Sequence, residues 1–406
     1  MELYAIKING WKNPMGFDYG VPQCSWKVRG NTGSRQETAR ISVGLDETLQ
    51  KVVFQKEGNL NPLGEALDFP LKPYTRYWYS IAVRSDQGEE ALSRPCFFET
   101  GKLDDPWKGQ WLGVEDGDTH PEFQKTFSLP EKPRSARLYI CGLGLFEAYI
   151  NGEKAGDDLL APFLNDYTEH FQYCTYDVTS LLAQDNTLSV LLGDGWYRGH
   201  FGLGEPTHYE RPLALIAELR MEFADGHTET LCSDSGWQYR SSFTTLSDIY
   251  NGETQDYTKA PGDWKQPVLI PAPGRLCDRY SSPLHYMESI PVKEVIHTPL
   301  GETVLDFGQN FAGHVVCSQS IPKGTTMTLE FGEVLQNGNF YHENYRHAES
   351  KFTYVSDGIV REIRPRFTFF GFRYVKVSGL DRVDAACFEG RAIYSEMDRT
   401  GFIRTG

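Results

Sequence analysis

Short apolar runs of strand length recur along the whole chain, and glycine, proline and asparagine separate them. Many runs alternate apolar and polar residues, which is the period of a half-buried β-strand, as in RYWYSIAVRSDQGEE and TMTLEFGEV. No long stretch shows the 3.6-residue spacing of an amphipathic helix. The pattern therefore predicts an all-β protein, and 406 residues with 39 glycines and 22 prolines are too many for one core.

The pattern divides the chain into three consecutive β-sandwiches. Residues 1–104 are the first, where LKPYTRYWYSIAVRSDQG and the closing FFETG are similar to a fibronectin type III domain, which is an immunoglobulin-like sandwich. Residues 105–285 are predicted to form a jelly roll, and the Asn-Gly dipeptide at 151–152 predicts a hairpin turn within it. Residues 286–397 are predicted to form a further sandwich, with strands such as TVLDFG and FEGRAIYSEM.

The tail at 398–406 is expected to be a linker. It ends on Phe402 and Ile403, two apolar residues that the preceding pattern leaves without a partner. Because no helical domain precedes this tail, we expect the chain to be the front part of a longer polypeptide.

The net charge and the cysteine pattern limit which partners and which cellular location are expected. The formal net charge of −15 argues against binding to nucleic acid. The eight cysteines lie far apart without any CxxC pair, which favours reduced thiols and a cytoplasmic location. No basic leader followed by an apolar stretch is visible at the N-terminus, and no run approaches the roughly 20 apolar residues of a membrane helix.

Several kinds of chemistry have no support in the sequence. The ten histidines form no HxH or HExxH pattern, so zinc is not expected. No GxSxG motif indicates a nucleophilic serine. No GxGxxG or phosphate-binding loop indicates a nucleotide cofactor.

The stretch LLGDGWYRGHFG at 191–202 is an apolar strand that runs into a glycine-rich turn. Glycine lets backbone approach a ligand closely, and Trp196 offers a flat ring to a sugar. Two structural alternatives stand beside this interpretation. Trp196 could cover the edge of a core, and Arg198 could form a salt bridge with Asp194 or Asp166 rather than contact a ligand.

The order of motifs resembles a known family. YINGEKAGDDLLAP, GDGWYRG, IYNGETQDY, LDFGQNFAG, FGEVLQNGNFY, FTFFGFRYV and YSEMDRTG are together similar to the non-catalytic β-domains of bacterial α-L-rhamnosidases, glycoside hydrolase family 78. The resemblance covers essentially the whole chain. It implies that residues 105–285 match the carbohydrate-binding-like domain and that residues 286–397 pack on a catalytic domain.

In that family an (α/α)6 barrel follows the segment that matches MDRTGFIRTG and carries the catalytic carboxylates of an inverting hydrolase. The resemblance therefore implies that this chain lacks those carboxylates and is inactive alone. Glu253 and Asp256, or Asp157 and Asp158, are the first alternatives for an acid–base pair, which an inverting enzyme places roughly 6.5–9.5 Å apart. We favour a structural role for Glu253, as a buried carboxylate that accepts backbone hydrogen bonds and pins a loop between sheets.

In some family members the domain matching the second sandwich binds rhamnose with calcium. The resemblance places the calcium ligands at Asp157, Asp158 and a carbonyl of the Tyr209–Pro212 loop, with Pro212 as the named position. It places sugar contacts at these two aspartates, Trp196 and Arg198. A solvated acidic turn is the alternative for Asp157 and Asp158.

The chain departs from the family beside this predicted site. Members usually have Pro-Gly-Trp-Thr-Asp-Tyr where this chain has PFLNDY at 162–167, so the glycine and the tryptophan are gone. The stretch HFGLGEPTHYERP is also short. Both departures change the loops beside the predicted sugar site.

Three functions follow from the sequence. The first is the accessory β-region of an α-L-rhamnosidase, whose partners are rhamnose-containing glycosides or a missing catalytic domain. The second is a free-standing calcium-dependent rhamnose-binding protein. The third is a structural or adhesion array of β-sandwiches. An exposed apolar patch around Phe402 and FTFFGF would favour docking to a further domain.

Overall fold

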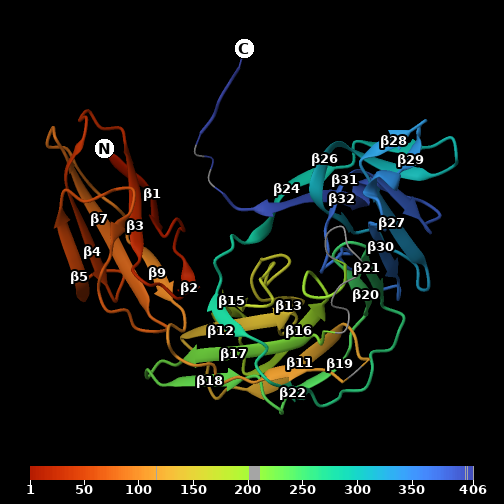
Figure 1. Cartoon of the computed structure of the whole chain (residues 1–406), viewed down its shortest axis with the longest axis horizontal. Coiled ribbons are helices and arrows are strands. Elements are labelled where there is room, and N and C mark those ends of the chain that lie inside the picture. Colours follow the sequence, from red (N-terminus) through yellow and green to blue (C-terminus); the bar gives the residue numbers. More distant parts are fainter. Residues whose placement is uncertain (116, 201–210, 398, 400, 406) are drawn as a thin grey trace. The chain divides into compact units, whose positions relative to one another are not determined.

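The computed structural model describes the chain except residues 116, 201–210, 398, 400 and 406. Its described regular structure consists of strands and three short 3-10 turns, which confirms the predicted all-β class (Figure 1). The chain separates into two compact units, residues 1–107 with 277–279 and residues 108–276 with 280–406. None of the described helices is long and apolar enough to cross a membrane.

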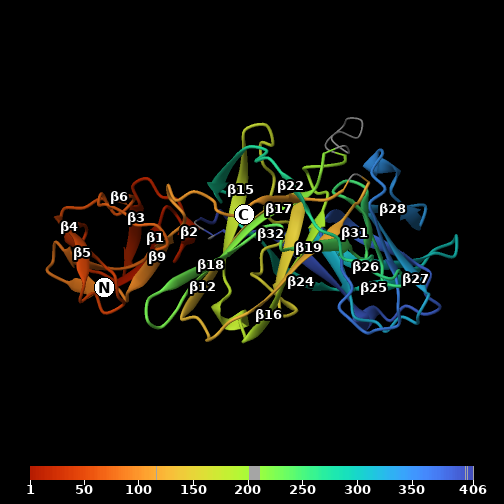
Figure 2. The ribbon, with the colours of Figure 1, turned by 90° about the horizontal axis from the view of Figure 1, so that it is seen from below.

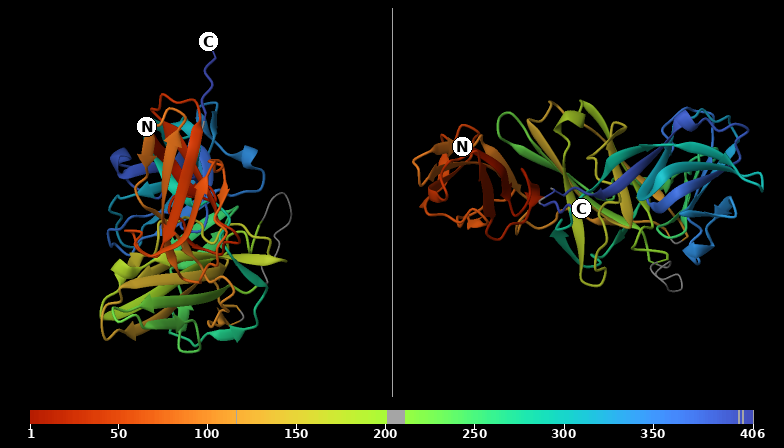
Figure 3. Two further views of the ribbon diagram at one scale, coloured as in Figure 1. Left: turned by 90° about the vertical axis from the view of Figure 1, so that its left-hand side faces the viewer. Right: turned by 90° about the horizontal axis from the view of Figure 1, so that it is seen from above.

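The first unit has two sheets, with the strand orders β1-β3-β6 and β2-β9-β7-β4-β5, and β8 pairs with β7. The strands are β1 (Glu2–Ile8), β2 (Met15–Phe17), β3 (Gln23–Arg29), β4 (Gln36–Gly44), β5 (Val52–Gly58), β6 (Glu65–Ala66), β7 (Arg76–Ser85), β8 (Glu90–Leu92) and β9 (Cys96–Thr100). Along β7 every second side chain is buried, as its alternating sequence predicts. The right panel of Figure 3 shows the strands of this unit arranged around their core.

The second unit begins with a two-sheet domain. One sheet has the order β22-β10-β17-β12-β15-β23, with β18 added to β17, and the other has the order β14-β13-β16-β11-β19 (Figure 2). Its elements are β10 (Trp111–Gly113), β11 (Pro121–Ser128), β12 (Ser135–Leu143), β13 (Leu145–Ile150), β14 (Glu153–Lys154), β15 (His170–Asp177), η1 (Thr179–Leu181), β16 (Asp185–Gly193), β17 (Ala214–Glu222), β18 (Thr228–Cys232), β19 (Gln238–Ser241), β22 (Val268–Ile270) and β23 (Arg275–Asp278). The predicted hairpin is confirmed, since Asn151 and Gly152 both have positive φ between β13 and β14.

The remaining strands form a nine-stranded sheet with the order β20-β21-β30-β27-β31-β26-β32-β24, to which β25 is added at β26, and a separate β28-β29 hairpin. The elements are β20 (Thr244–Asp248), β21 (Gly252–Asp256), β24 (Leu284–Pro291), β25 (Glu294–His297), β26 (Thr303–Cys317), β27 (Thr326–Gly332), β28 (Val334–Gln336), β29 (Asn339–Tyr341), η2 (Glu343–Tyr345), β30 (Lys351–Val355), β31 (Phe370–Ser378), η3 (Ala385–Cys387) and β32 (Phe388–Ser395). We call this sheet and its core the third domain. The core contains the stacked rings of Phe331 and Phe370, whose centroids are 3.8 Å apart.

Two features of the third domain could not be predicted from the local sequence pattern: the sheet to which β20 and β21 belong, and the bulge in β26. The strands β20 and β21 come before residue 285, yet β21 pairs in parallel with β30 and so belongs to the third sheet. The long strand β26 is irregular between Asp306 and Phe311, where Gly308 has a φ of 80°. Strand β26 pairs with β31 on both sides of this bulge, but its other neighbour is β25 before the bulge and β32 beyond it.

Candidate functional site

The GDGWYRG turn lies where the second domain meets the third. A buried apolar cluster there combines residues of both domains, namely Leu145, Leu159, Leu160, Leu191, Phe367 and Ile393. Trp196 is partly buried against this cluster, and its ring centroid lies 6.5 Å from that of Phe369. The indole therefore covers an apolar core, as in the structural alternative for this residue.

The glycines of this turn permit close packing between side chains and backbone. A Cβ atom on Gly193 would lie 2.3 Å from the ring of Phe367, and one on Gly195 would lie 2.4 Å from Leu145. Gly195 also has a φ of 56°, a backbone conformation that residues other than glycine rarely adopt. In this structure both positions need glycine because a neighbouring apolar side chain fills the space.

Arg198 pairs with Asp194, as one of its two interpretations predicted. The distance from Arg198 Nε to Asp194 Oδ1 is 3.6 Å. His120 Nε2 lies 3.5 Å from the other carboxylate oxygen of Asp194, and all three side chains are largely buried. This contact assigns Arg198 a structural partner inside the protein.

Asp157 and Asp158 lie beside a histidine that the sequence did not point to. His285 Nε2 is 3.4 Å from Asp157 Oδ1 and 3.3 Å from Asp158 Oδ1. The Asp157 side chain is 89% exposed, whereas that of Asp158 is only 7% exposed. The hydrogen bond to Asp158, together with the charges of Asp157, Asp158 and Glu396, raises the pKa of His285.

The donor set around these aspartates does not fit calcium. Calcium takes six to eight hard oxygen ligands, but a ring nitrogen of His285 faces both carboxylates. The hydroxyl of Tyr176 donates to Asp158 Oδ2 over 3.3 Å, and the ammonium of Lys154 donates to the Asp158 carbonyl. Asp158 thus already has protein partners at its carboxylate and at its carbonyl oxygen, and the third ligand-type atom beside the two carboxylates is a nitrogen, which calcium does not favour.

The other predicted site residues are not joined to this pair by any contact in the described part of the chain. Pro212 is exposed just before β17, and residues 209 and 210 of its predicted loop lie outside the described residues. Trp196 and Arg198 make the contacts given above. Trp196 packs against the cluster that contains Leu159 and Leu160, the two residues that follow Asp158 in the chain.

Glu253 has the structural role that we favoured. Its buried carboxylate accepts hydrogen bonds from the backbone N–H groups of Arg366 and Phe367, at 2.9 and 2.8 Å, and from the amide of Gln255. Burial raises the pKa of Glu253. The carboxylate fixes the segment that leads into β31 against β21.

A buried ionic network beside this segment was not visible from the sequence. Glu147 of β13 pairs with Arg364 at 2.8 Å and with Arg366, and the Tyr149 hydroxyl donates to Glu147 Oε2 over 2.5 Å. Burial opposes ionisation of Glu147, but the two guanidinium groups hold its pKa well below the usual value. Because 217 residues separate Glu147 from Arg364, no local pattern could have revealed the pair.

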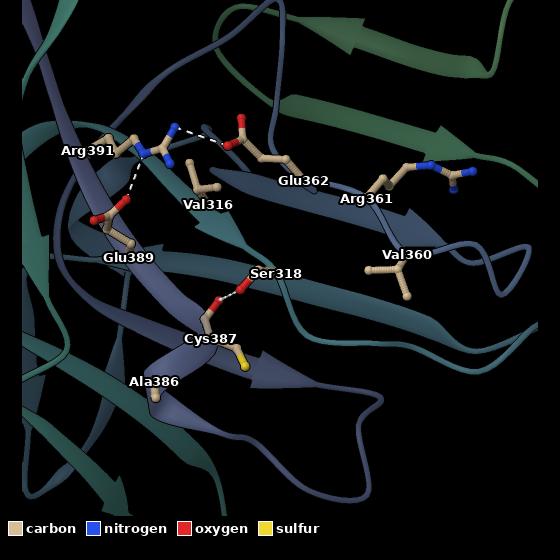
Figure 4. Close-up of a pocket in the computed structure, with 9 residues that line it drawn as sticks. All are labelled: Val316, Ser318, Val360, Arg361, Glu362, Ala386, Cys387, Glu389 and Arg391. Atoms are coloured by element: carbon tan, nitrogen blue, oxygen red, sulfur yellow. Dashed lines mark hydrogen bonds and ion pairs between the residues drawn. The ribbon is translucent and has the colours of Figure 1, made fainter.

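A groove of about 490 Å³ opens on the third domain (Figure 4). It is lined by Val316, Ser318, Val360, Arg361, Glu362, Ala386, Cys387, Glu389 and Arg391. Arg391 pairs with Glu362 at 3.2 Å and with Glu389 at 2.7 Å, while Arg361 points away from them to pair with Asp357. Both arginines of the groove are therefore paired with carboxylates, and its described lining residues include no aromatic side chain.

Three consecutive parts of the chain match models of known protein families. Three family models match the chain in order: the Rha78A-like N-terminal immunoglobulin domain over 3–104, the α-L-rhamnosidase N-terminal domain over 131–284, and the bacterial α-L-rhamnosidase concanavalin-like domain over 296–394. The sequence is 29% identical to an α-L-rhamnosidase of Alteromonas sp. over 425 residues, covering 94% of this chain and 46% of the relative. It is 38% identical to one of Streptomyces avermitilis over 274 residues, covering 64% of this chain and 27% of the relative.

Solved structures give the same result. The crystal structure of the α-L-rhamnosidase from Aspergillus terreus matches with a TM-score of 0.90 and 28% identity, over 98% of this chain and 50% of that one. The enzyme from Dictyoglumus thermophilum matches with a TM-score of 0.86 and 27% identity, over 97% and 49% of the two chains. This chain spans about half the length of the relatives that it matches over most of its own length.

The fold and these matches define the chain as a series of β-domains of the kind found in α-L-rhamnosidases. The chain belongs to the bacterial α-L-rhamnosidase family, of which it contains the N-terminal immunoglobulin-like, N-terminal and concanavalin-like domains.

Proposed function

We propose that this chain is the accessory β-region of an α-L-rhamnosidase and that it is hydrolytically inert by itself. The observation that carries the proposal is the ordered succession of three rhamnosidase β-domain models over 3–104, 131–284 and 296–394. The relatives named α-L-rhamnosidase extend to about twice the matched length. The catalytic carboxylates would then belong to a separate domain, which removes terminal α-L-rhamnosyl groups.

The carboxylates proposed as alternatives support inertness. Glu253 is buried and accepts three hydrogen bonds, so it is not placed to protonate a glycosidic oxygen. The carboxylate of Asp256 accepts from the N–H and hydroxyl of Thr258 at 3.0 and 2.6 Å, as in an ordinary turn. Glu147 is held ionised by two arginines and has no proton to donate.

A hydrolysis assay tests this proposal. The purified 406-residue chain is incubated with an aryl α-L-rhamnoside, and release of the aryl group is followed beside an active α-L-rhamnosidase. We expect no turnover above a buffer blank, from protein whose cooperative thermal unfolding shows that it is folded. Robust turnover that co-purifies with the chain would overturn the proposal.

Sugar binding by the second domain is a separate proposal. It rests on the partly exposed ring of Trp196 and, in its calcium-dependent form, on the adjacent carboxylates of Asp157 and Asp158. The basic side chains near those carboxylates favour a calcium-independent form. Calorimetry with L-rhamnose, in calcium and in chelator, distinguishes the two forms.

A further inference from the structure

The motif LDFGQNFAG forms a surface that the accessory function leaves unused. It contains the bulge of β26, where Gln309 and Asn310 are exposed in the middle of a long strand. Asn310 Nδ2 donates to Glu333 Oε1 over 2.8 Å, and Asn344 Nδ2 donates to Glu333 Oε2 over 3.0 Å. We call Asn310, Glu333 and Asn344 the amide cluster.

The amide cluster is held in place before any ligand arrives. Glu333 follows β27, Asn344 lies in η2 and Asn310 lies at the bulge, so three separate segments converge on one carboxylate. Each amide uses one N–H on Glu333, while an asparagine side chain has two N–H donors and a carbonyl acceptor. The cluster therefore offers fixed donors and acceptors to solvent, and such fixed groups lose little conformational entropy on binding.

The ring of Tyr345 and the exposed backbone at Gly371 lie next to the amide cluster. Tyr345 follows Asn344, and its hydroxyl donates to the carbonyl oxygen of Gly371. Burial and the charge of Glu333 raise the pKa of Tyr345, so its hydroxyl remains protonated. Gly371 pairs with Ala312 on β26, both are exposed, and no atom lies within 4 Å of where a Cβ of Gly371 would stand.

Phe369 extends the same face. It precedes Gly371 by two residues, and it is 36% exposed although Phe367, Phe370 and Phe372 are buried. Phe369 directly precedes β31, whose Phe370 and Phe372 face the core while Gly371 faces outward, so the exposed Phe369 ring lies on the outer side at the start of the strand, with its centroid 6.5 Å from that of Trp196. Polar groups that can bond hydroxyls and a ring that can pack on C–H groups thus adjoin one shallow surface.

From this arrangement we propose that the outer face at Asn310, Glu333, Asn344, Tyr345, Gly371 and Phe369 is a binding surface for a neutral glycoside. The amide cluster would bond adjacent sugar hydroxyls, and the rings of Tyr345 and Phe369 would pack against apolar sugar faces. The carboxylate of Glu333 disfavours an anionic saccharide. The choice of a rhamnoside as the sugar rests on the proposed function, whereas the surface itself rests on this geometry.

Saturation-transfer NMR and calorimetry with methyl α-L-rhamnopyranoside test the surface on the full chain. We expect millimolar binding that weakens at least tenfold in Asn310→Ala and in Asn344→Ala. Glu333→Gln keeps the size of the side chain and should also weaken binding, because it loses one of the two carboxylate acceptors. The exposed Gln87→Ala in the first unit is the matched control and should bind like the parent chain.

Thermal unfolding of each variant must match the parent chain, since these side chains are mainly exposed. Undiminished binding in both asparagine variants would overturn the inference, and so would an absence of binding by the parent chain. Loss of binding in Trp196→Ala, with undiminished binding in both asparagine variants, would also overturn it and would place the sugar at the neighbouring rings of Trp196 and Phe369 instead of at the amide cluster. All of these outcomes leave the hydrolysis assay as an independent measure of the proposed function.

Discussion

Glu147 and Arg364 form an ion pair of 2.8 Å across the junction of the second and third domains, with side chains that are 4% and 11% exposed. Arg366 adds a second guanidinium to the same carboxylate. An ion pair this well buried is expensive to form but still more expensive to break, since the remaining partner keeps its charge without a counterion. The junction therefore depends on all three residues together.

Removing the carboxylate should strongly destabilise the second unit. In Glu147→Gln two buried arginines lose their shared counterion, and we expect a loss of about 3–5 kcal/mol in the free energy of unfolding. Urea unfolding measures this loss. The control is Glu2→Gln, which removes an exposed partner of Arg29 and should change stability little. If both substitutions lowered the free energy of unfolding equally, the Glu147–Arg364 pair would not stabilise the junction as proposed.

Adding one methyl group to the GDGWYRG turn should also weaken the junction. The Cβ of Gly193→Ala would lie 2.3 Å from the Phe367 ring, which has to shift within a packed cluster. We expect a loss of about 1–3 kcal/mol by overpacking. Differential scanning calorimetry should show a lower unfolding temperature for the unit that contains residue 193. At Gly20 an added Cβ meets nothing within 4 Å, so Gly20→Ala should leave both transitions nearly unchanged.

The buried His314 should make the third domain sensitive to acid. Its Nε2–H donates to the Thr368 carbonyl over 2.7 Å, and its Nδ1 accepts from the Tyr286 hydroxyl over 2.8 Å, which is the pattern of a neutral ring. Burial lowers the pKa of His314 to about 3 from an ordinary value of 6.5. Between these values the unfolded chain binds more protons than the folded one, so the histidine lowers stability as pH falls through this window.

Unfolding measured at pH 7 and at pH 5 isolates this contribution. Other groups titrate in both proteins, so the comparison is between the parent chain and His314→Gln. We expect the parent to lose up to about 2 kcal/mol more than the variant between the two pH values, from about 1.4 kcal/mol per pH unit. Parallel pH dependences would show that His314 does not stay neutral in the fold.

Calcium should not stabilise the chain. His285 and Lys154 lie beside Asp157 and Asp158, and among the described residues the group that faces the two carboxylates is a histidine rather than a further oxygen ligand of the kind calcium prefers. Thermal unfolding in 5 mM calcium, a concentration of roughly the order that weak extracellular sites require, should match unfolding in chelator. A rise in unfolding temperature with calcium that disappears in Asp157→Ala would establish a site after all.

Period-two patterns and turn chemistry predicted the elements that depend on neighbouring residues. Alternate burial along β7 and the hairpin at Asn151 and Gly152 are of this kind. The salt bridge from Arg198 to Asp194, four residues away, and the buried role of Glu253 were among the predicted alternatives. Each of these predictions needs only the residue type and a short segment of chain.

Long-range pairing could not be predicted in this way. The strands β20 and β21 alternate like other strands, and nothing within residues 244–256 indicates that β21 pairs with β30. His285 joins Asp157 and Asp158 from 127 residues away along the chain. The segment FTFFGF was considered as an exposed apolar patch, yet only Phe369 of its four phenylalanines is exposed, although Phe402 in the tail is 71% exposed. In each case the outcome depends on a segment that is distant in the sequence but adjacent in the fold, so a local pattern could not predict it.

The parallel pairing of β21 with β30 also decides where this chain can be cut. A fragment that starts at residue 286, where the alternating pattern resumes, would lack β20 and β21 and would expose the backbone of β30 as a bare sheet edge. A fragment that ends there would carry two strands with no sheet to join. Separate expression of the second and third domains should therefore yield aggregating halves, whereas the segment from Lys108 onward should be recovered as one folded piece.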